Sequence, residues 1–162
     1  MNAAADTVTL HQLSVDEARA ILRGQTTGDV DWAPGFPSFE HVDFLRAFIA
    51  DSTAHREPGP FGLYLVILEN QKLVIGGAGF VGRPDADGSV EIVVELEPLV
   101  RKQGYGTEAI AALVEIARRN GARRVTTGTS VEDANGQRAM ERGGFTEVGR
   151  DEWLVYYAVD LG

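Results

Sequence analysis

The sequence predicts a single mixed α/β domain organised around one sheet. Its 162 residues correspond to one domain, which is large enough to bury roughly 70% of the surface that its unfolded chain exposes. The hydrophobic fraction of 44% and the charged fraction of 24% exclude a disordered or collagen-like chain. Strand-like and helix-like segments alternate in the order β-α-α-β-β-β-α-β-α-β-β without internal repeats, and this interleaving is typical of a sheet flanked by helices.

The first two elements are a short strand and a capped helix. Residues Val8–Leu13 predict the strand. Ser14, followed three positions later by Glu17, has the pattern of a capping box, in which each side chain binds the backbone N–H of the other residue. The apolar stripe of the helix consists of Ala18, Ile21 and Leu22.

A loop, a second helix and a hairpin follow. The segment 24–35 (GQTTGDVDWAPG) is rich in turn-forming residues and predicts a loop. Ser38 predicts the N-cap of the second helix. The apolar face of that helix consists of Val42, Leu45, Phe48 and Ile49. After the helix-breaking EPGP, Phe61–Leu68 and Leu73–Val81 predict a hairpin that turns at Asn70.

The second half starts with Ser89–Leu96, a β-branched strand that ends before Pro98. The loop 101–106 (RKQGYG) then leads into a helix that Gly121 ends. The expected buried stripe of this helix is Ile110, Leu113, Val114 and Ala117.

The chain closes with three strands and one helix. Arg124–Thr129 predicts a strand, and Asp133–Arg142 predicts a short helix ended by Gly143 and Gly144. Phe145–Val148 and Trp153–Val159 predict a final hairpin.

Composition narrows the classes of function. The net charge of −9 argues against nucleic acid as a partner, because phosphate binding needs a Lys/Arg surface. It mildly favours a cationic substrate, although acidity also serves solubility. The chain has no cysteine, which excludes disulfides, cysteine zinc sites and thiol nucleophiles. No signal-peptide or transmembrane pattern is visible, so we predict a cytoplasmic protein without a membrane partner.

The loop 101–106 is the most informative segment of the sequence. Gly104 and Gly106 allow a tight turn that leaves backbone N–H groups accessible, and the following helix adds the positive end of its dipole. With Arg101 and Lys102 nearby, this predicts a site for a phosphate or pyrophosphate. The alternative is that the glycines only turn the chain.

A dinucleotide-binding fold is a competing interpretation of this loop. Residues 104–109 (GYGTEA) also fit the G-x-G-x-x-A fingerprint of a Rossmann unit. That fold needs its first strand near the start of the domain and an acidic residue about 20 positions further on. About a hundred residues precede the loop and the next strand ends in TTGTS, so we disfavour an NAD(P)-binding oxidoreductase.

Two segments resemble a known family. VEIVVELEPLVRKQGYGTEAIAALVEIA is similar to the acetyl-CoA-binding motif of the GNAT superfamily of N-acetyltransferases, with its [QR]-x-x-G-x-[GA] core. DANGQRAMERGGF resembles the last helix of that superfamily, which ends in Gly-Phe. The residues of both segments are most similar to the branch of the superfamily that is related to ribosomal-protein N-terminal acetyltransferases. The resemblance implies one domain over residues 1–162, with the cofactor part at about 60–160 and the acceptor helices at about 14–50.

The resemblance also implies how the cofactor is held. The sheet is mostly antiparallel, and its fourth strand (89–96) splays from its fifth (124–129). The backbone of Val94, Glu95 and Leu96 pairs with the pantetheine arm of acetyl-CoA, and the N–H groups of residues 102–107 hold the pyrophosphate. The cofactor loop consists of Arg101, Lys102, Gln103, Gly104, Tyr105, Gly106 and Thr107.

The implied reaction is direct transfer of the acetyl group to an amine. No metal is implied, and His11, His41 and His55 are too scattered in the sequence to suggest a ligand set. The protonated amine, with a pKa near 10, must lose its proton before it attacks, and a carboxylate can accept it.

Two glutamates are candidates for this base. Glu91, Glu95 and Glu97 share parity on one strand and therefore point to one face. In relatives a glutamate at or near the position of Glu91 is the base, so Glu91 is the first choice and Glu95 the second. The alternative is that all three are solvent-facing strand residues.

Two positions depart from the family pattern. Counted back from Gly144, the position that usually holds an asparagine in contact with CoA is Asp133, with Asn135 two residues on. Either residue could instead be a helix N-cap. Met140 stands where many members have a tyrosine general acid, so we expect Met140 to pack against the acyl end of the cofactor. Tyr156 is then the main remaining hydroxyl that could reach the sulfur, and Tyr105 is less favoured.

The acceptor pocket is expected between the loop after the first helix, the second helix and the last hairpin. Its candidate walls are Trp32, Phe36, Phe44 and Trp153, and its candidate amine contacts are Asp29, Asp31 and Glu40. The alternative is that these aromatic residues belong to the core, which is the more common place for aromatic residues near helices. The expected partner is a small-molecule or peptide amine. The sequence does not decide whether the protein forms a homodimer. A non-catalytic acyl-CoA-binding or sensory module of the same fold is the main alternative to an enzyme.

Overall fold

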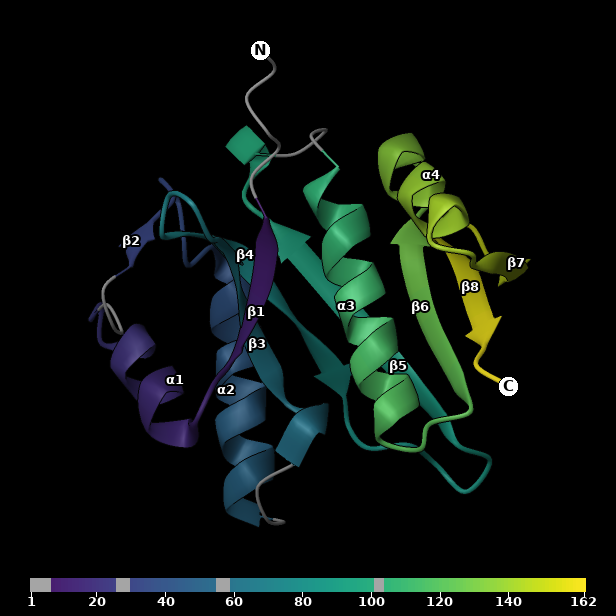
Figure 1. Cartoon of the computed structure of the whole chain (residues 1–162), viewed down its shortest axis with the longest axis horizontal. Helices are drawn as coiled ribbons and strands as arrows, with labels where there is room; N and C mark the ends of the chain where they lie inside the picture. Colours follow the sequence, from purple (N-terminus) through teal and green to yellow (C-terminus); the bar gives the residue numbers. More distant parts are fainter. Residues whose placement is uncertain (1–6, 26–29, 55–58, 101–103) are drawn as a thin grey trace.

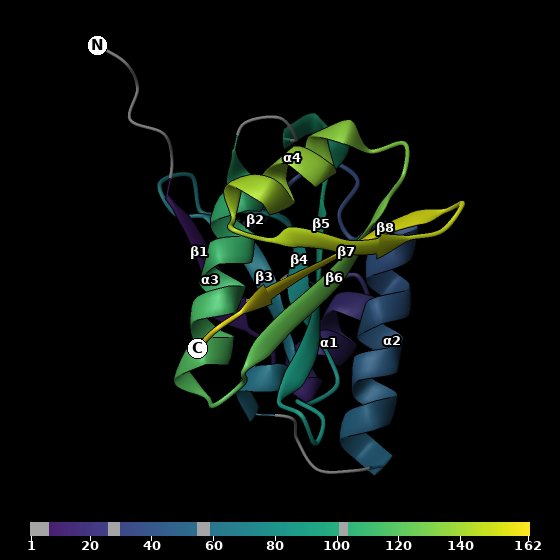
Figure 2. The ribbon, with the colours of Figure 1, turned by 90° about the vertical axis from the view of Figure 1, so that its right-hand side faces the viewer.

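The structure is a computed structural model that describes residues 7–25, 30–54, 59–100 and 104–162. Within these residues, an eight-stranded sheet lies between two layers of helices (Figures 1 and 2). Helices α1 (Val15–Leu22) and α2 (Phe39–Ala54) cover one face. Helices α3 (Tyr105–Arg119) and α4 (Ala134–Arg142) cover the other face.

The order of the strands confirms the predicted mixed, mostly antiparallel sheet. In sheet order the strands are β1 (Val8–Gln12), β3 (Leu63–Leu68), β4 (Leu73–Val81), β5 (Ser89–Leu96), β6 (Arg124–Ser130), β8 (Leu154–Asp160) and β7 (Thr146–Arg150). Along this path every described pair is antiparallel except β5–β6.

One strand was not expected. Within the predicted loop 24–35, β2 (Asp31–Trp32) pairs in parallel with β4. The backbone N–H of Asp31 donates to the carbonyl of Lys72, and that of Ala33 donates to the carbonyl of Val74. Two residues are too few to show a strand period in the sequence, so the pairing depends on the tertiary partner.

Most predicted boundaries agree within one or two residues. The capping box is confirmed, because the N–H of Glu17 donates to Ser14 Oγ at 3.1 Å and the N–H of Ser14 donates to Glu17 Oε1 at 3.0 Å. Two boundaries differ by two residues: Phe61 belongs to a 3₁₀ turn (Gly59–Phe61) rather than to β3, and β7 continues to Arg150.

The sheet separates two hydrophobic cores. The larger core packs α3 and α4 onto the sheet, and it contains the whole stripe predicted for α3, namely Ile110, Leu113, Val114 and Ala117. The smaller core packs α1 and α2 onto the opposite face through Ala18, Ile21 and Leu45. None of the helices in the described part of the chain is both long and apolar enough to cross a bilayer.

The predicted splay lies between β5 and β6. The two strands pair only over Ser89–Glu91 and Arg124–Thr126, although both continue beyond these residues. At the next position the hydroxyl of Thr127 donates to the carbonyl of Ile92 at 2.9 Å. This side-chain bond replaces the next main-chain bond of the ladder, so the strands separate from this point.

Candidate functional site

A cleft of about 610 Å³ opens where β5 and β6 part. The ends of the two strands form its sides, and the beginnings of α3 and α4 complete it. Its lining includes the predicted cofactor residues Val94, Glu95, Leu96, Gly104, Gly106, Thr107, Asp133, Asn135 and Met140. The structure therefore brings these distant segments into one site.

The backbone of β5 presents polar groups to this cleft. Main-chain groups of a strand alternate between its two neighbours. The carbonyl of Ile92 faces β6, because Thr127 donates to it. The N–H and C=O of Val94, two residues further on, therefore also point towards β6, into the opening.

The beginning of α3 favours an anion at one end of the cleft. Gly104 is the N-cap residue and has a φ of +84°, a left-handed conformation that glycine adopts without strain. Helix N-termini bind anions through their exposed N–H groups and their dipole. A Cβ added to Gly106 would lie 3.8 Å from Leu96 Cδ1, in ordinary contact. Arg101, Lys102 and Gln103 lie outside the described residues, and the side chain of Tyr105 is buried in the core.

The α4 side of the cleft contains Asp133 and Asn135, the two residues that are candidates for either a helix cap or a cofactor contact. Asp133 is the N-cap of α4, and its Oδ1 accepts from the N–H of Gly136 at 2.9 Å. Asn135 Oδ1 accepts from Arg138 at 2.6 Å. Asp133 thus acts as a helix cap, while both side chains still border the cleft. Met140 is buried and lines the same cleft.

The opposite face of β5 borders a second, smaller cavity of about 20 Å³. This cavity lies between the sheet and α2, and Phe36, Phe44 and His41 are among its lining residues. Val93 and Glu95 line both the small cavity and the large cleft. At this segment β5 therefore forms the partition between the two sides of the sheet.

Glu91 and Glu95 occupy different positions on this partition. Glu91 is exposed and pairs with Thr126, the last pair before the strands part. Glu95 is half-buried and lies further along, between the two cavities. Glu97, by contrast, is buried, so the solvent-facing alternative is wrong for this residue.

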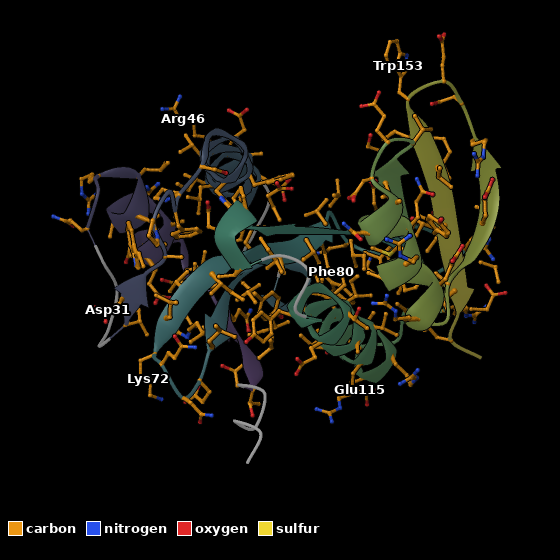
Figure 3. All side chains as sticks on the ribbon, turned by 90° about the horizontal axis from the view of Figure 1, so that it is seen from above. Asp31, Arg46, Lys72, Phe80, Glu115 and Trp153 are labelled. Atoms are coloured by element: carbon orange, nitrogen blue, oxygen red, sulfur yellow. The ribbon has the colours of Figure 1, made fainter. Side chains whose placement is uncertain are left out.

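The final hairpin places Tyr156 near Glu91. The Tyr156 hydroxyl donates to Asp151 Oδ2 at 2.7 Å, and this bond, with a smaller contribution from the charge of Glu91, raises the pKa of Tyr156. Asp151 Oδ1 accepts from the N–H groups of Trp153 and Leu154, each at 2.8 Å. Asp151 therefore holds both the turn of the hairpin and the tyrosine, and Trp153 projects from the turn with 72% of its surface exposed (Figure 3).

The remaining acceptor candidates are spread over the molecule. Figure 3 shows Asp31 and Trp153 at opposite ends of the sheet, and Asp31 is exposed on β2. Trp32 packs edge-on against Phe36, with ring centroids 5.4 Å apart, as part of the smaller core. Asp29 and the side chain of Glu40 lie outside the described part of the structure.

Sequence reasoning missed a buried polar cluster next to the partition. His41 and Glu97 are both buried, and Glu97 Oε1 lies 3.3 Å from His41 Nδ1. The N–H of Ser38 donates to Nδ1 at 3.1 Å. The spacing Ser38-x-x-His41 is that of a capping box with histidine in place of Glu or Gln, and this pattern was the available signal. Among the described residues, no group of three or more His, Cys, Asp or Glu is arranged to hold a metal ion.

The topology also excludes the Rossmann interpretation. A Rossmann unit places its glycine loop after a strand of a mostly parallel sheet. Here the preceding strand, β5, is antiparallel to β4, and it is parallel to β6 over three pairs only.

Comparison with known proteins gives a consistent result. The family model described as "Acetyltransferase (GNAT) domain" matches residues 7–146. A Bacillus subtilis (strain 168) protein, named as the uncharacterized N-acetyltransferase YjdG, is 26% identical over 122 residues, which cover 75% of this chain and 69% of that protein.

Solved structures with the same fold include enzymes named for different acceptors. A spermidine N-acetyltransferase SpeG chimera from Vibrio cholerae and hSSAT has a TM-score of 0.68 and 13% identity, over 95% of each chain. RimL, a ribosomal L7/L12 α-N-protein acetyltransferase, has a TM-score of 0.65 and 18% identity, over 96% of this chain and 94% of that chain. The yncA protein from Salmonella typhimurium, solved with its cofactor acetyl-CoA, has a TM-score of 0.62 and 19% identity, over 96% of this chain and 94% of that chain.

Proposed function

The chain belongs to the GNAT family of acetyltransferases, and from this premise we propose that it transfers the acetyl group of acetyl-CoA directly to a primary amine. The observation that carries the proposal is the cleft between the parted ends of β5 and β6, with the N-terminus of α3 at its rim. This arrangement offers main-chain groups to an amide-containing arm and helix N–H groups to a pyrophosphate.

The residues that line the cleft fit acetyl-CoA, which supplies an activated thioester. The main chain of Val94 would bind the pantetheine arm, and the amides around Gly104–Thr107 would bind the pyrophosphate. Met140 would pack against the acyl end, because its flexible apolar side chain adapts to irregular shapes. Gly106 supports this assignment, since the missing side chain leaves the main chain of α3 accessible from the cleft.

We propose that the amine approaches from the opposite face of β5. Glu91 is the proposed general base, because it lies at the last pair before the strands part and its carboxylate is exposed. It would accept the proton of the ammonium group before attack, since an amine with a pKa near 10 is almost fully protonated at pH 7. Glu95, which borders both cavities, is the second candidate for this role.

No strong acid is required for release of CoA. A thiol with a pKa near 8.5 leaves as a thiolate far more readily than an alkoxide or an amide ion. Met140 has no proton to donate. Tyr156 is the hydroxyl that could supply one, but its proton is held in the bond to Asp151.

The test is a panel of amines incubated with acetyl-CoA, with release of free thiol as the readout. The panel contains peptides with free N-termini, polyamines, aminoglycosides and amino acids, so that it includes the acceptors named for SpeG and RimL. Turnover with at least one amine, together with the mass of an acetylated product, is the expected result. Tight binding of acetyl-CoA without turnover of any amine would instead favour an acyl-CoA-binding or sensory module.

A further inference from the structure

The buried cluster at the start of α2 has no role in the chemistry proposed above. His41 lies in the first turn of α2 and is 4% exposed. Its ring lies 4.9 Å from that of Phe36, centroid to centroid. Gly77 of β4 also lies against the ring, since an added Cβ there would lie only 3.2 Å from His41 Cδ2. The imidazole therefore occupies space that a side chain at position 77 would take.

The hydrogen bonds of the ring define its orientation. Nε2 lies 2.8 Å from the carbonyl oxygen of Glu95. A carbonyl can only accept, so Nε2 carries a proton and donates it to Glu95. The N–H of Ser38 donates to Nδ1 at 3.1 Å, and the Ser38 hydroxyl lies 2.7 Å from the same nitrogen. Ser38 thus fixes one edge of the ring while the other edge binds β5.

The bonded carbonyl belongs to the partition between the two cavities. The segment 92–95 has left the ladder with β6 but stays paired with β4, and side chains also bond its first and last residues, Thr127 to Ile92 and His41 to Glu95. These two side chains come from different elements, β6 and α2. In a trans peptide the N–H of the next residue points opposite to the carbonyl. The bond from His41 therefore also sets the direction of the Leu96 amide, on the side of the cleft.

We propose that His41 is a positioning residue, which holds the Glu95 carbonyl and so keeps the splayed segment of β5 in the geometry that binds acetyl-CoA. The role of acetyl-CoA rests on the proposed function. Without the bond, the Glu95 peptide could tilt within the β4–β5 ladder and turn the Leu96 amide away from the cleft. Gly77 and Ser38 are part of the same arrangement, since one makes room for the ring and the other orients it.

The test compares His41→Leu with His41→Gln by calorimetric titration of acetyl-CoA. The amide nitrogen of Gln is as many bonds from Cα as Nε2 of His, so Gln can keep the donor, whereas Leu removes it. We expect the Kd of acetyl-CoA to rise threefold to tenfold in His41→Leu, the range of one hydrogen bond, and to stay within about twofold of the wild type in His41→Gln. His11→Leu, which changes an exposed histidine bonded to Glu17 on α1, is the matched control and should leave the Kd unchanged.

A second measurement does not depend on the cofactor. Amide hydrogen exchange of the ligand-free protein should be faster in residues 92–97 of His41→Leu than of the wild type, with slow exchange retained in α3. Uniformly faster exchange would indicate general destabilisation and would overturn the proposal. An unchanged Kd in His41→Leu would overturn it as well. Failure of the wild type to bind acetyl-CoA at all would contradict the proposed function instead, and the exchange experiment would still test whether His41 holds β5.

Discussion

At the scale of single residues, the two glutamates of β5 differ in their surroundings more than in their chemistry. Glu91 is exposed and close enough to Tyr156 to contribute to its raised pKa. Glu95 is half-buried, and its main chain is bound by His41. The proposed base must be able to accept a proton from the substrate ammonium, and Glu91 is favoured because its side chain is exposed at the point where the strands part.

Replacement of Glu91 by Gln should therefore lower the turnover rate. Gln keeps the shape but cannot accept the proton, so we expect a loss of about 10²–10⁴-fold near pH 7. The loss should shrink at high pH, where the amine is already neutral. Steady-state rates from pH 6 to pH 10 test this, with Glu115→Gln on the far side of α3 as control. Normal turnover in Glu91→Gln together with a large loss in Glu95→Gln would transfer the role to Glu95.

The release of CoA gives a second prediction at this scale. Met140→Leu approximately conserves volume, and Tyr156→Phe removes only the hydroxyl that is bonded to Asp151. Because a thiolate is a tolerable leaving group, both variants should keep the single-turnover rate within about tenfold. A hundredfold loss in Tyr156→Phe, with the alkaline limb of its pH profile missing, would show that Tyr156 is a general acid.

At the scale of elements, α3 and the β7–β8 hairpin contribute differently to the site. The glycines at the start of α3 have no side chain, so they leave the main chain there accessible from the cleft. The hairpin contributes Asp151, whose carboxylate bonds both the turn of the hairpin and Tyr156. The first arrangement can be tested by adding a side chain, and the second by removing a charge.

Gly106→Asp should abolish the binding of acetyl-CoA without unfolding the protein. Position 106 lies inside α3 and has room for a Cβ, so the fold tolerates a side chain there. The carboxylate would project at the proposed pyrophosphate site and repel it. Gly106→Ala is the matched control, and it should bind acetyl-CoA more strongly than Gly106→Asp because it adds no charge. Unchanged affinity in Gly106→Asp, measured by calorimetry, would remove the α3 N-terminus from the site.

The hairpin should respond to acid through Asp151. The bond from Tyr156, followed by the N–H groups of Leu154 and Trp153, lowers the pKa of Asp151 below its usual range. A carboxyl whose pKa is lowered on folding stabilises the fold above its unfolded pKa, and this stabilisation is lost as the pH falls through the folded pKa. The fluorescence of Trp153 should therefore change below about pH 4, a range set by the reference pKa of Asp. Asp151→Asn should lack that transition, and its Tyr156 should titrate closer to the usual pKa near 10. Identical acid transitions in both proteins would show that another group is responsible.

At the scale of the whole molecule, the sheet divides the proposed reaction between its two faces. The cleft lies on the side of α3 and α4, the small cavity lies under α2, and Val93 and Glu95 belong to both linings. A ligand in the cleft would therefore contact β5, β6, α3 and α4 together. Without a ligand, β5 and β6 are paired with each other only before the point where they part.

Acetyl-CoA should stabilise the folded protein as a unit. A ligand that binds only the native state at a hundred times its Kd adds about 2.7 kcal/mol. For a domain of this size that corresponds to a rise in Tm of about 5–10 °C. Differential scanning fluorimetry checks this, with Gly106→Asp as the variant that should show no rise. A wild-type Tm that does not change with acetyl-CoA would contradict binding in the cleft.

The sequence alone determined those features that depend on near neighbours in the chain. The capping box of Ser14 and Glu17, the buried stripe of α3 and the left-handed Gly121 all involve residues within one or two helical turns. The bounds of β4 and β5 agree with the sequence pattern for the same reason, because strand alternation is local. The glycine loop and its likeness to GNAT proteins likewise occupy one continuous segment, so the family could be predicted before the fold was known.

Only the tertiary structure decided which distant residues share the site. The bond of Thr127 to Ile92 spans 35 positions, and that of His41 to Glu95 spans 54. No local period encodes such contacts, since they depend on how strands of one sheet align and on where α2 begins relative to β5. For this reason the sequence could place Glu91, Glu95 and Glu97 on one face but could not show that the first is exposed, the second borders two cavities and the third is buried beside His41. The type of each residue and its place in a helix or strand follow from the local sequence, whereas its burial and its contact partners depend on tertiary packing.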